Sequence, residues 1–207
     1  MRARFLEIID RNANRLTLLI DDLLLLSTLD SGRLRLDLQP VSVRAATQEV
    51  ADDFATRARA RAVALENSVP GDLVVRADPD RLRQVLSNLI DNGIKYGGDG
   101  GRVAVDGKVL ADGRIEVRVS DDGPGLSPEV QPRIFERFYR VDKARSREQG
   151  GTGLGLAIVK HVVQAQGGEV RVESRPGAGT SFFFTLPEAA EGREEAAASR
   201  AKADGRK

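Results

Sequence analysis

The sequence predicts an α+β fold in which one long amphipathic helix precedes a compact unit of alternating helices and strands. Apolar residues recur at steps of three or four over residues 2 to about 30, which is the helical period. The remainder alternates between short strand patterns and helices with recognisable caps. With 207 residues, of which 41% are hydrophobic and 30% charged, the chain suits one globular domain with an appendage.

Composition excludes several classes of function. The formal net charge of +1 gives no electrostatic reason to expect binding to nucleic acid or to a membrane surface. The chain has no cysteine, so disulfides and thiolate metal sites are excluded. No apolar run is longer than Leu23–Leu26, far short of the ~20 residues that span a bilayer. We therefore expect a soluble chain, with any membrane anchor of a parent protein outside it.

The predicted first helix carries an apolar stripe and ends at Asp30, Ser31 and Gly32, where the glycine suits a C-terminal stop. A helix this apolar on one side needs a partner. It either packs on its own domain or forms one strand of a helical hairpin or coiled-coil dimer, and the pattern favours the second. The stripe consists of Phe5, Ile9, Leu16, Leu19, Leu23 and Leu26.

The first half of the compact unit begins with Leu34, Leu36 and Leu38, which alternate with polar residues and predict a half-buried strand. Ser42 is placed to cap a helix that runs to about Arg61. Two short strands, 63–69 and 73–76, follow it.

The second half begins with Asp78 and Pro79, a capping carboxylate before a proline, which start a helix that ends near Gly97. A D-G turn signal at 112–113 separates two predicted strands. Further along, we expect a charged, mobile loop, a helix, two strands and a disordered tail from Glu188, which lacks large apolar residues. In order, the predicted segments are strands 102–109 and 114–120, loop 126–150, helix 154–166, and strands 169–174 and 180–186.

Three polar and glycine clusters carry the chemistry. In N-L-I-D-N-G-I-K-Y (88–96), Asn88, Asn92, Lys95 and Tyr96 share one face of a helix. An amide oxygen there is a neutral ligand for a hard cation such as Mg²⁺, which bridges phosphates, and the lysine supplies a positive charge for the same phosphates.

The other two clusters add base recognition and anion binding. In D-D-G-P-G (121–125), Asp121 follows a strand, where its carboxylate can accept a hydrogen bond from the amino group of a base. In G-G-T-G-L-G-L (150–156), glycines open a helix and expose amides to anions. The last cluster has Leu156 where a P-loop requires lysine, and it lacks the final glycine of a dinucleotide fingerprint. The ordered set predicts a nucleotide site.

Together these motifs resemble those of the ATP-binding catalytic domain of bacterial sensor histidine kinases, whose fold is shared with gyrase, Hsp90 and MutL ATPases. The first cluster is similar to the N box of that family, with Gly93 where alanine is usual, and the second and third are similar to the G1 and G2 boxes. Residues 134–140 (I-F-E-R-F-Y-R) resemble the F box, and 177–187 resemble the closing strand. The resemblance implies a two-layer α/β sandwich in which helices cover one face of a mixed sheet.

The resemblance implies the site residues as well. Three would have catalytic roles: Asn88 as the Mg²⁺ ligand, with Lys95 and Arg140 reaching the phosphates. Asn92 would contact phosphate, and Asp121 would recognise adenine. Residues 140–152 would form a lid over ATP. The other implied nucleotide-binding residues are Tyr96, Gly123, Gly125, Lys143, Thr152, Gly153, Leu154, Gly155, Leu156 and Thr180.

The implied organisation has three parts. Residues 1–31 resemble the second helix of the family's dimerisation hairpin, 34–187 the ATP-binding catalytic domain, and 188–207 are the tail. The implied partners are ATP, the histidine-bearing first helix of the hairpin and a response-regulator receiver domain. The implied parent is a homodimer anchored in the bacterial inner membrane, with this part in the cytoplasm.

One part of the family pattern is missing. The family's phosphoacceptor is a histidine on the first hairpin helix, followed by an acidic residue. The single histidine here, His161, follows the G2 box and lies between Lys160 and Val162, without a neighbouring carboxylate. We therefore expect the chain to bind Mg-ATP without phosphorylating itself in cis, as a fragment cut between the hairpin helices would.

Two other functions stay open. Gyrase-type hydrolases place a glutamate, the general base for water, four residues before a metal-binding asparagine; the corresponding residue here is Asn88, which cannot accept a proton at neutral pH. The F box also argues against a hydrolase. A pure nucleotide-binding module would carry the same binding residues, so the sequence does not exclude it.

Overall fold

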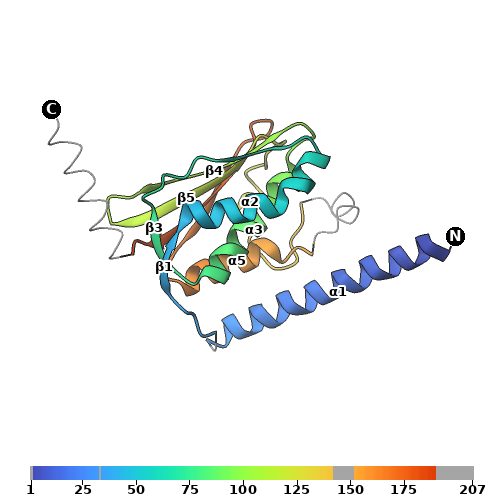
Figure 1. The fold of residues 1–207 in the computed structure, drawn as a ribbon, viewed down its shortest axis with the longest axis horizontal. Helices are drawn as coiled ribbons and strands as arrows, with labels where there is room; N and C mark the ends of the chain where they lie inside the picture. The colour runs from blue at the N-terminus through green and yellow to red at the C-terminus, as the bar shows by residue number, and fades with distance from the viewer. Residues whose placement is uncertain (1, 33, 142–151, 190–207) are drawn as a thin grey trace.

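The computed structural model describes residues 2–32, 34–141 and 152–189 of the chain. Figure 1 shows one long helix that runs beside a compact two-layer unit. The elements, in chain order, are α1 (Arg2–Asp30), β1 (Gln39–Ser42), α2 (Val43–Ala60), β2 (Ala64–Asn67), β3 (Val74–Ala77), α3 (Pro79–Tyr96), β4 (Arg102–Val109), β5 (Arg114–Asp121), the 3-10 turn η1 (Gln131–Arg133), α5 (Gly155–Ala165), β6 (Val170–Ser174) and β7 (Thr180–Pro187).

The main sheet has five strands in the order β2-β4-β5-β7-β6. The β2–β4 pair is parallel and the other neighbours are antiparallel, so the sheet is mixed. Strands β1 and β3 form a separate antiparallel pair. Helices α2, α3 and α5 form a layer against one face of the main sheet (Figure 1). The predicted α+β two-layer sandwich is confirmed.

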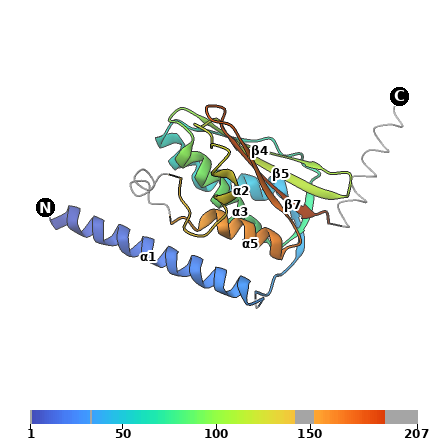
Figure 2. The same cartoon turned by 180° about the vertical axis from the view of Figure 1, so that it is seen from behind.

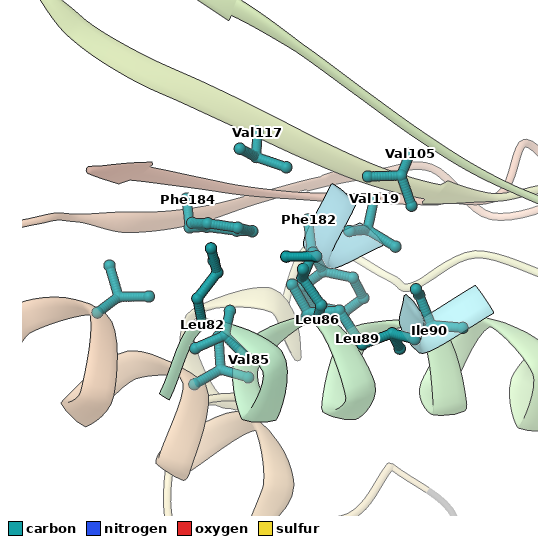
Figure 3. Packing of buried hydrophobic residues seen from close by; sticks show 14 of the residues in the cluster. Leu82, Val85, Leu86, Leu89, Ile90, Val105, Val117, Val119, Phe182 and Phe184 are labelled. Atoms are coloured by element: carbon teal, nitrogen blue, oxygen red, sulfur yellow. The ribbon is translucent and has the colours of Figure 1, made fainter. Parts of the chain in front are cut away.

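The hydrophobic core lies between the helical layer and the sheet (Figure 3). Leu82, Leu86 and Leu89 on α3 are at most 1% exposed and point toward Val117 and Phe184 on the strands (Figure 3). A fully buried leucine or valine contributes about 1.5–3 kcal/mol relative to an exposed one. This packing holds α3 against the sheet and leaves its polar face for the site.

The predicted starts of α2 and α3 depend on capping side chains, and the structure confirms both. The Ser42 side chain accepts a hydrogen bond from the Ala45 amide (3.3 Å) at the start of α2. Asp78 caps α3 by accepting from the Arg81 amide at 3.1 Å, with Pro79 in the first turn. These side chains satisfy amide groups that have no partner within the helix.

Helix α1 contacts the domain through its C-terminal half. Leu26 is 1% exposed and lies in the core cluster, while Leu16 and Leu24 remain 59% and 60% exposed. In Figure 2 the helix runs below α5 and extends past the helical layer toward its N-terminus. The helix ends at Asp30, and Gly32 just beyond it has a φ of +63°, the left-handed conformation that glycine adopts without strain. One helix therefore combines a packed end with an exposed apolar stripe.

Three predictions need correction. Residues 34–38 keep the predicted alternation of burial but form no strand, because Asp37 directs its amide to the Asp78 carboxylate (3.0 Å) instead of to a neighbouring strand. Strand pairing begins only at Gln39.

The tail prediction is wrong for its first two residues: Glu188 forms an isolated bridge with Val75, and Ala189 is 2% exposed. Residues 190–207 lie outside the described part.

The third correction concerns the expected mobile loop at 126–150. Within its described residues, 126–141, Ile134 is 5% exposed and joins the core. The Phe135 ring meets the Phe182 ring edge to face, with centroids 6.4 Å apart. Two apolar anchors therefore fix the segment beside the sheet, despite its lack of sequence periodicity.

None of the helices in the described part of the chain combines the length and apolar character needed to cross a membrane.

Candidate active site

The three clusters and the F-box segment meet at one pocket of about 280 Å³ beside α3. The polar face of α3 forms one side of it, and the ends of β5 and β7 and the start of α5 form the others. The residues that line it are Asn88, Asp91, Asn92, Lys95, Tyr96, Asp121, Pro124, Gly125, Leu126, Ile134, Tyr139, Arg140, Val141, Thr152, Gly153, Gly155, Leu156, Thr180 and Phe182.

The α3 face has the predicted arrangement. Asn88, Asn92, Lys95 and Tyr96 all reach the pocket, as their helical spacing predicts. Asn88 is oriented by its own helix, because its Nδ2 donates to the Gln84 carbonyl at 3.1 Å. Its Oδ1 lies 2.7 Å from the position that a Cβ on Gly155 would occupy. The amide oxygen therefore lies directly against the start of α5, at the wall of the pocket.

Asp121 ends β5 and lies opposite Thr180 of β7 in the sheet register. Its Oδ1 accepts a hydrogen bond from the Gly123 amide at 2.9 Å. Burial raises the pKa of this carboxyl above its usual value, while the backbone amides of Gly123 and Thr180 act in the opposite direction. Gly125 has a φ of +71°, and a Cβ there would lie 2.0 Å from the Arg175 carbonyl oxygen. This turn therefore requires glycine.

The glycine segment supplies the opposite wall. The Gly153 carbonyl accepts the Phe138 amide at 2.9 Å, and Gly153 has a φ of +75°. This bond joins the F-box segment to the middle of the glycine segment. Phe138 is 59% exposed and has a φ of +62°, a conformation that non-glycine residues rarely adopt. Helix α5 begins at Gly155 with its amides next to the pocket, where an anion is stabilised.

Most of the predicted site residues that the structure describes come together, and two do not. Gly123 does not line the pocket and instead donates its amide to Asp121. Leu154 is fully buried and belongs to the core. Lys143 lies outside the described residues, as does most of the expected lid.

Gly93, where the family resemblance leads one to expect alanine, faces strand β4. A Cβ on Gly93 would lie 2.7 Å from Cγ2 of Val103, which is itself 1% exposed. The glycine therefore lets α3 approach the sheet more closely than an alanine would with the valine in this position.

Sequence reasoning missed part of the lining. Asp91 lies three residues after Asn88 and four before Lys95, so the helical spacing that identified those two could also have identified it. Phe182 lies two residues after Thr180 and therefore shares its face of β7. The others, which are Pro124, Leu126, Ile134, Tyr139 and Val141, come from irregular segments without a periodic signal.

The described residues contain no group of three or more histidine, aspartate or glutamate side chains that could hold a metal ion by themselves.

Curated relatives share this sequence over most of its length. Sensor histidine kinase WalK of Bacillus subtilis is 38% identical over 185 residues, which cover 89% of this chain and 30% of the relative. Sensor-like histidine kinase SenX3 of Mycolicibacterium smegmatis is 38% identical over 185 residues, which cover 89% of this chain and 48% of the relative. The chain thus spans less than half the length of these relatives.

Solved structures share the fold. Full-length ShkA in complex with AMPPNP matches with a TM-score of 0.75 and 32% identity, over 86% of this chain and 37% of that one. The mycobacterial sensor histidine kinase MprB matches with a TM-score of 0.63 and 31% identity, over 73% of this chain and 97% of that one. The family model described as histidine kinase-, DNA gyrase B-, and HSP90-like ATPase matches residues 77–190. The chain belongs to this family, and its relatives and structural neighbours are sensor histidine kinases and their catalytic domains.

Proposed function

We propose that this chain binds Mg-ATP and transfers its γ-phosphate to a histidine supplied by another polypeptide segment, as the catalytic part of a sensor histidine kinase. The observation that supports this most is the meeting of four sequence motifs, distant along the chain, around one pocket. The relatives are named as histidine kinases, and the structural neighbour ShkA was solved with an ATP analogue.

The pocket residues divide into a base end and a phosphate end. Asp121 would accept a hydrogen bond from the adenine amino group, with Thr180 beside it supporting that end. Asn92, Lys95 and Arg140 would contact the phosphates, and the amides at the start of α5 would add positive potential. Tyr96, Gly125, Thr152, Gly153, Gly155 and Leu156 would line the cleft.

The phosphate end suits a magnesium ion held largely by ATP. Asn88 has its Nδ2 bound to a carbonyl, which leaves its Oδ1, at the wall of the pocket beside the start of α5, as a neutral oxygen ligand. Mg²⁺ is often held in proteins by one or two side-chain oxygens together with substrate phosphates and water. When bound, the ion would neutralise charge on the phosphates during transfer.

In the proposed reaction, a ring nitrogen of the acceptor histidine bonds to the γ-phosphorus while the bond to the β,γ-bridging oxygen breaks and ADP leaves. The histidine's proton passes to the acidic residue beside it on the acceptor helix. The phosphoryl group then passes to an aspartate of a response-regulator receiver domain. His161, the only histidine here, does not line the pocket, so the acceptor comes from elsewhere.

The proposal also assigns the parts of the chain. Residues 1–31 are the second helix of a dimerisation hairpin, and the exposed leucines of α1 would be covered by the first helix and by a second subunit. Residues 34–187 are the catalytic domain. The parent protein would be a homodimer, anchored in the bacterial inner membrane, with this part in the cytoplasm.

Hydrolysis of ATP is the competing proposal. It requires a general base that activates water, and the gyrase-type position of that base holds Asn88. Asp91, the carboxylate nearest to it on α3, is engaged by Arg57 and Lys95. Phosphoryl transfer to a histidine is therefore the better-supported reaction.

The test combines binding and transfer. The chain is titrated with Mg-ATP by calorimetry, then incubated with γ-labelled Mg-ATP with and without a separate hairpin that bears the acceptor histidine. We expect binding, no label on the chain alone, and acid-labile label on the hairpin. Asp121→Asn should abolish binding while the fold persists.

Three outcomes would contradict the proposal. Stable label on the chain alone would show an acceptor within it. Phosphate release at about 1 s⁻¹ or faster would favour the hydrolase. Binding without transfer to any hairpin would leave a nucleotide-binding module.

A further inference from the structure

Asp91 divides its carboxylate between two cations from different helices. Its Oδ1 pairs with Arg57 of α2 and its Oδ2 pairs with Lys95, one turn further along α3. The Asp91 and Lys95 side chains are only 20% and 17% exposed, and both line the pocket. Screening by water and salt is weaker at such sites than on an open surface. The ammonium group of Lys95 is therefore held in one place before any ligand arrives.

The contact with Arg57 belongs to a larger brace between the helices. Residues 49, 53 and 57 of α2 are spaced by four and share one face of the helix. Arg83 of α3 pairs with Glu49 and Asp53, and Arg57 pairs with Asp91. Only the pair with Asp91 reaches the pocket. The Arg57–Asp91 pair is therefore the place where this set of ion pairs between α2 and α3 reaches the pocket-lining face of α3.

The charge balance of the three residues also suits a phosphate. An isolated carboxylate beside a triphosphate would repel it. Two cations offset the single carboxylate, which leaves the group with a net charge of +1. The Asp91 carboxylate can therefore lie in the pocket without repelling the phosphates of ATP. A carboxylate retained at such a position is explained if it positions a neighbouring group.

We infer that Asp91 is a positioning residue that directs Lys95 at the transferring phosphate, with Arg57 holding Asp91 from α2. The inference rests on the proposed phosphotransfer function. Asp91 itself does not touch the substrate. Loss of Asp91 should therefore lower turnover and not affinity. Removing its negative charge does not weaken the attraction of the pocket for Mg-ATP. A displaced Lys95, however, fails to stabilise charge in the transition state.

The test compares turnover with affinity in Asp91→Asn, assayed on the full chain with a separate histidine-bearing hairpin at saturating Mg-ATP. We expect turnover to fall about tenfold, with a dissociation constant for Mg-ATP no weaker than that of the wild type. Asp91→Glu keeps the charge but moves the carboxylate by one methylene, so it should also lose turnover. In a Lys95→Met background, Asp91→Asn should cause no further loss, because the two residues act as one unit.

Asp53→Asn is the matched control. It removes an ion pair between the same two helices, away from the pocket, and should leave turnover and affinity unchanged. A purely structural role for Asp91 predicts a lower free energy of unfolding and a normal turnover in the folded protein, and that result would overturn the inference. So would a loss that is additive with Lys95→Met. Wild-type chain that binds no Mg-ATP or transfers no phosphate would instead contradict the proposed function.

Discussion

At the scale of single residues, the site depends on close approaches that only glycine permits. Gly155 opens α5 directly against Asn88, and a Cβ there would lie 2.7 Å from the amide oxygen proposed to hold Mg²⁺. A contact of that length requires the amide to move. The N-box and G2-box segments therefore meet at the amide oxygen of Asn88, although 67 positions separate it from Gly155.

We predict that Gly155→Ala weakens Mg-ATP binding about tenfold, which corresponds to about 1.4 kcal/mol, because the displaced amide oxygen no longer meets the ion. Binding of ATP in excess chelator should change less, since it does not use that oxygen. Calorimetry with and without Mg²⁺ measures the difference. Gly71→Ala, at a position with open space around it, is the control. Equal losses with and without Mg²⁺ would mean that the methyl group blocks the nucleotide itself.

At the scale of elements, α2 stabilises the end of α3 that carries the site. Arg61, at the C-terminus of α2, donates to the Ile94 and Lys95 carbonyls, the latter at 2.8 Å. These carbonyls lie in the last turn of α3, where helical partners are missing and a cation is favoured. The same guanidinium pairs with Asp99 at 3.0 Å. One side chain therefore closes the helix next to Tyr96.

Removing this cap should loosen one turn specifically. We predict that Arg61→Ala lowers the free energy of unfolding by about 1–3 kcal/mol, the usual range for hydrogen bonds to a charged group. Amide exchange should accelerate most at the end of α3. Urea unfolding and hydrogen exchange by NMR measure the two effects. Arg59→Ala, an exposed change on another face of α2, should have little effect. Uniform acceleration of exchange over the domain would argue against a local cap.

The elements also show how far local patterns predict this structure. Ser42 and Asp78 identified their helices because a cap is a local interaction between neighbours in sequence. Leu34 and Leu38 alternate like a strand, yet strand formation needs a partner edge, which no local pattern specifies. Tyr139 was not predicted to line the pocket, because its position depends on the tertiary packing of an irregular segment.

At the scale of the whole molecule, one cluster joins α1 to the catalytic domain. Arg137 of the F-box segment pairs with Asp30 at the end of α1 (2.6 Å) and lies 3.3 Å from Nε2 of His161 on α5. This cluster connects three segments far apart in sequence at the point where α1 meets the domain. The environment of these side chains therefore depends on whether α1 and the domain remain in contact.

His161 makes this contact measurable, because the chain has no other histidine and its ring gives unambiguous NMR signals. Burial lowers the pKa of His161 below 6.5, and the positive charge of Arg137 lowers it further. We predict a titration midpoint below 6.5 in the wild type and a shift toward 6.5 in Arg137→Ala. Arg133→Ala, in the same loop, should leave the midpoint unchanged, because among the described residues Arg133 forms its ion pair with Glu136 and not with the cluster.

The lowered pKa of His161 also contributes to the pH dependence of stability. Between the folded-state pKa of His161 and about 6.5, the unfolded chain binds more protons than the folded one, so the free energy of unfolding rises with pH through that window. It falls as the solution is acidified, because the partly buried imidazole resists protonation beside a guanidinium. His161→Gln should flatten this part of the profile in urea unfolding measured from pH 5 to 7.5. A slope unchanged by that substitution would show that the pKa of His161 is not lowered in the folded chain.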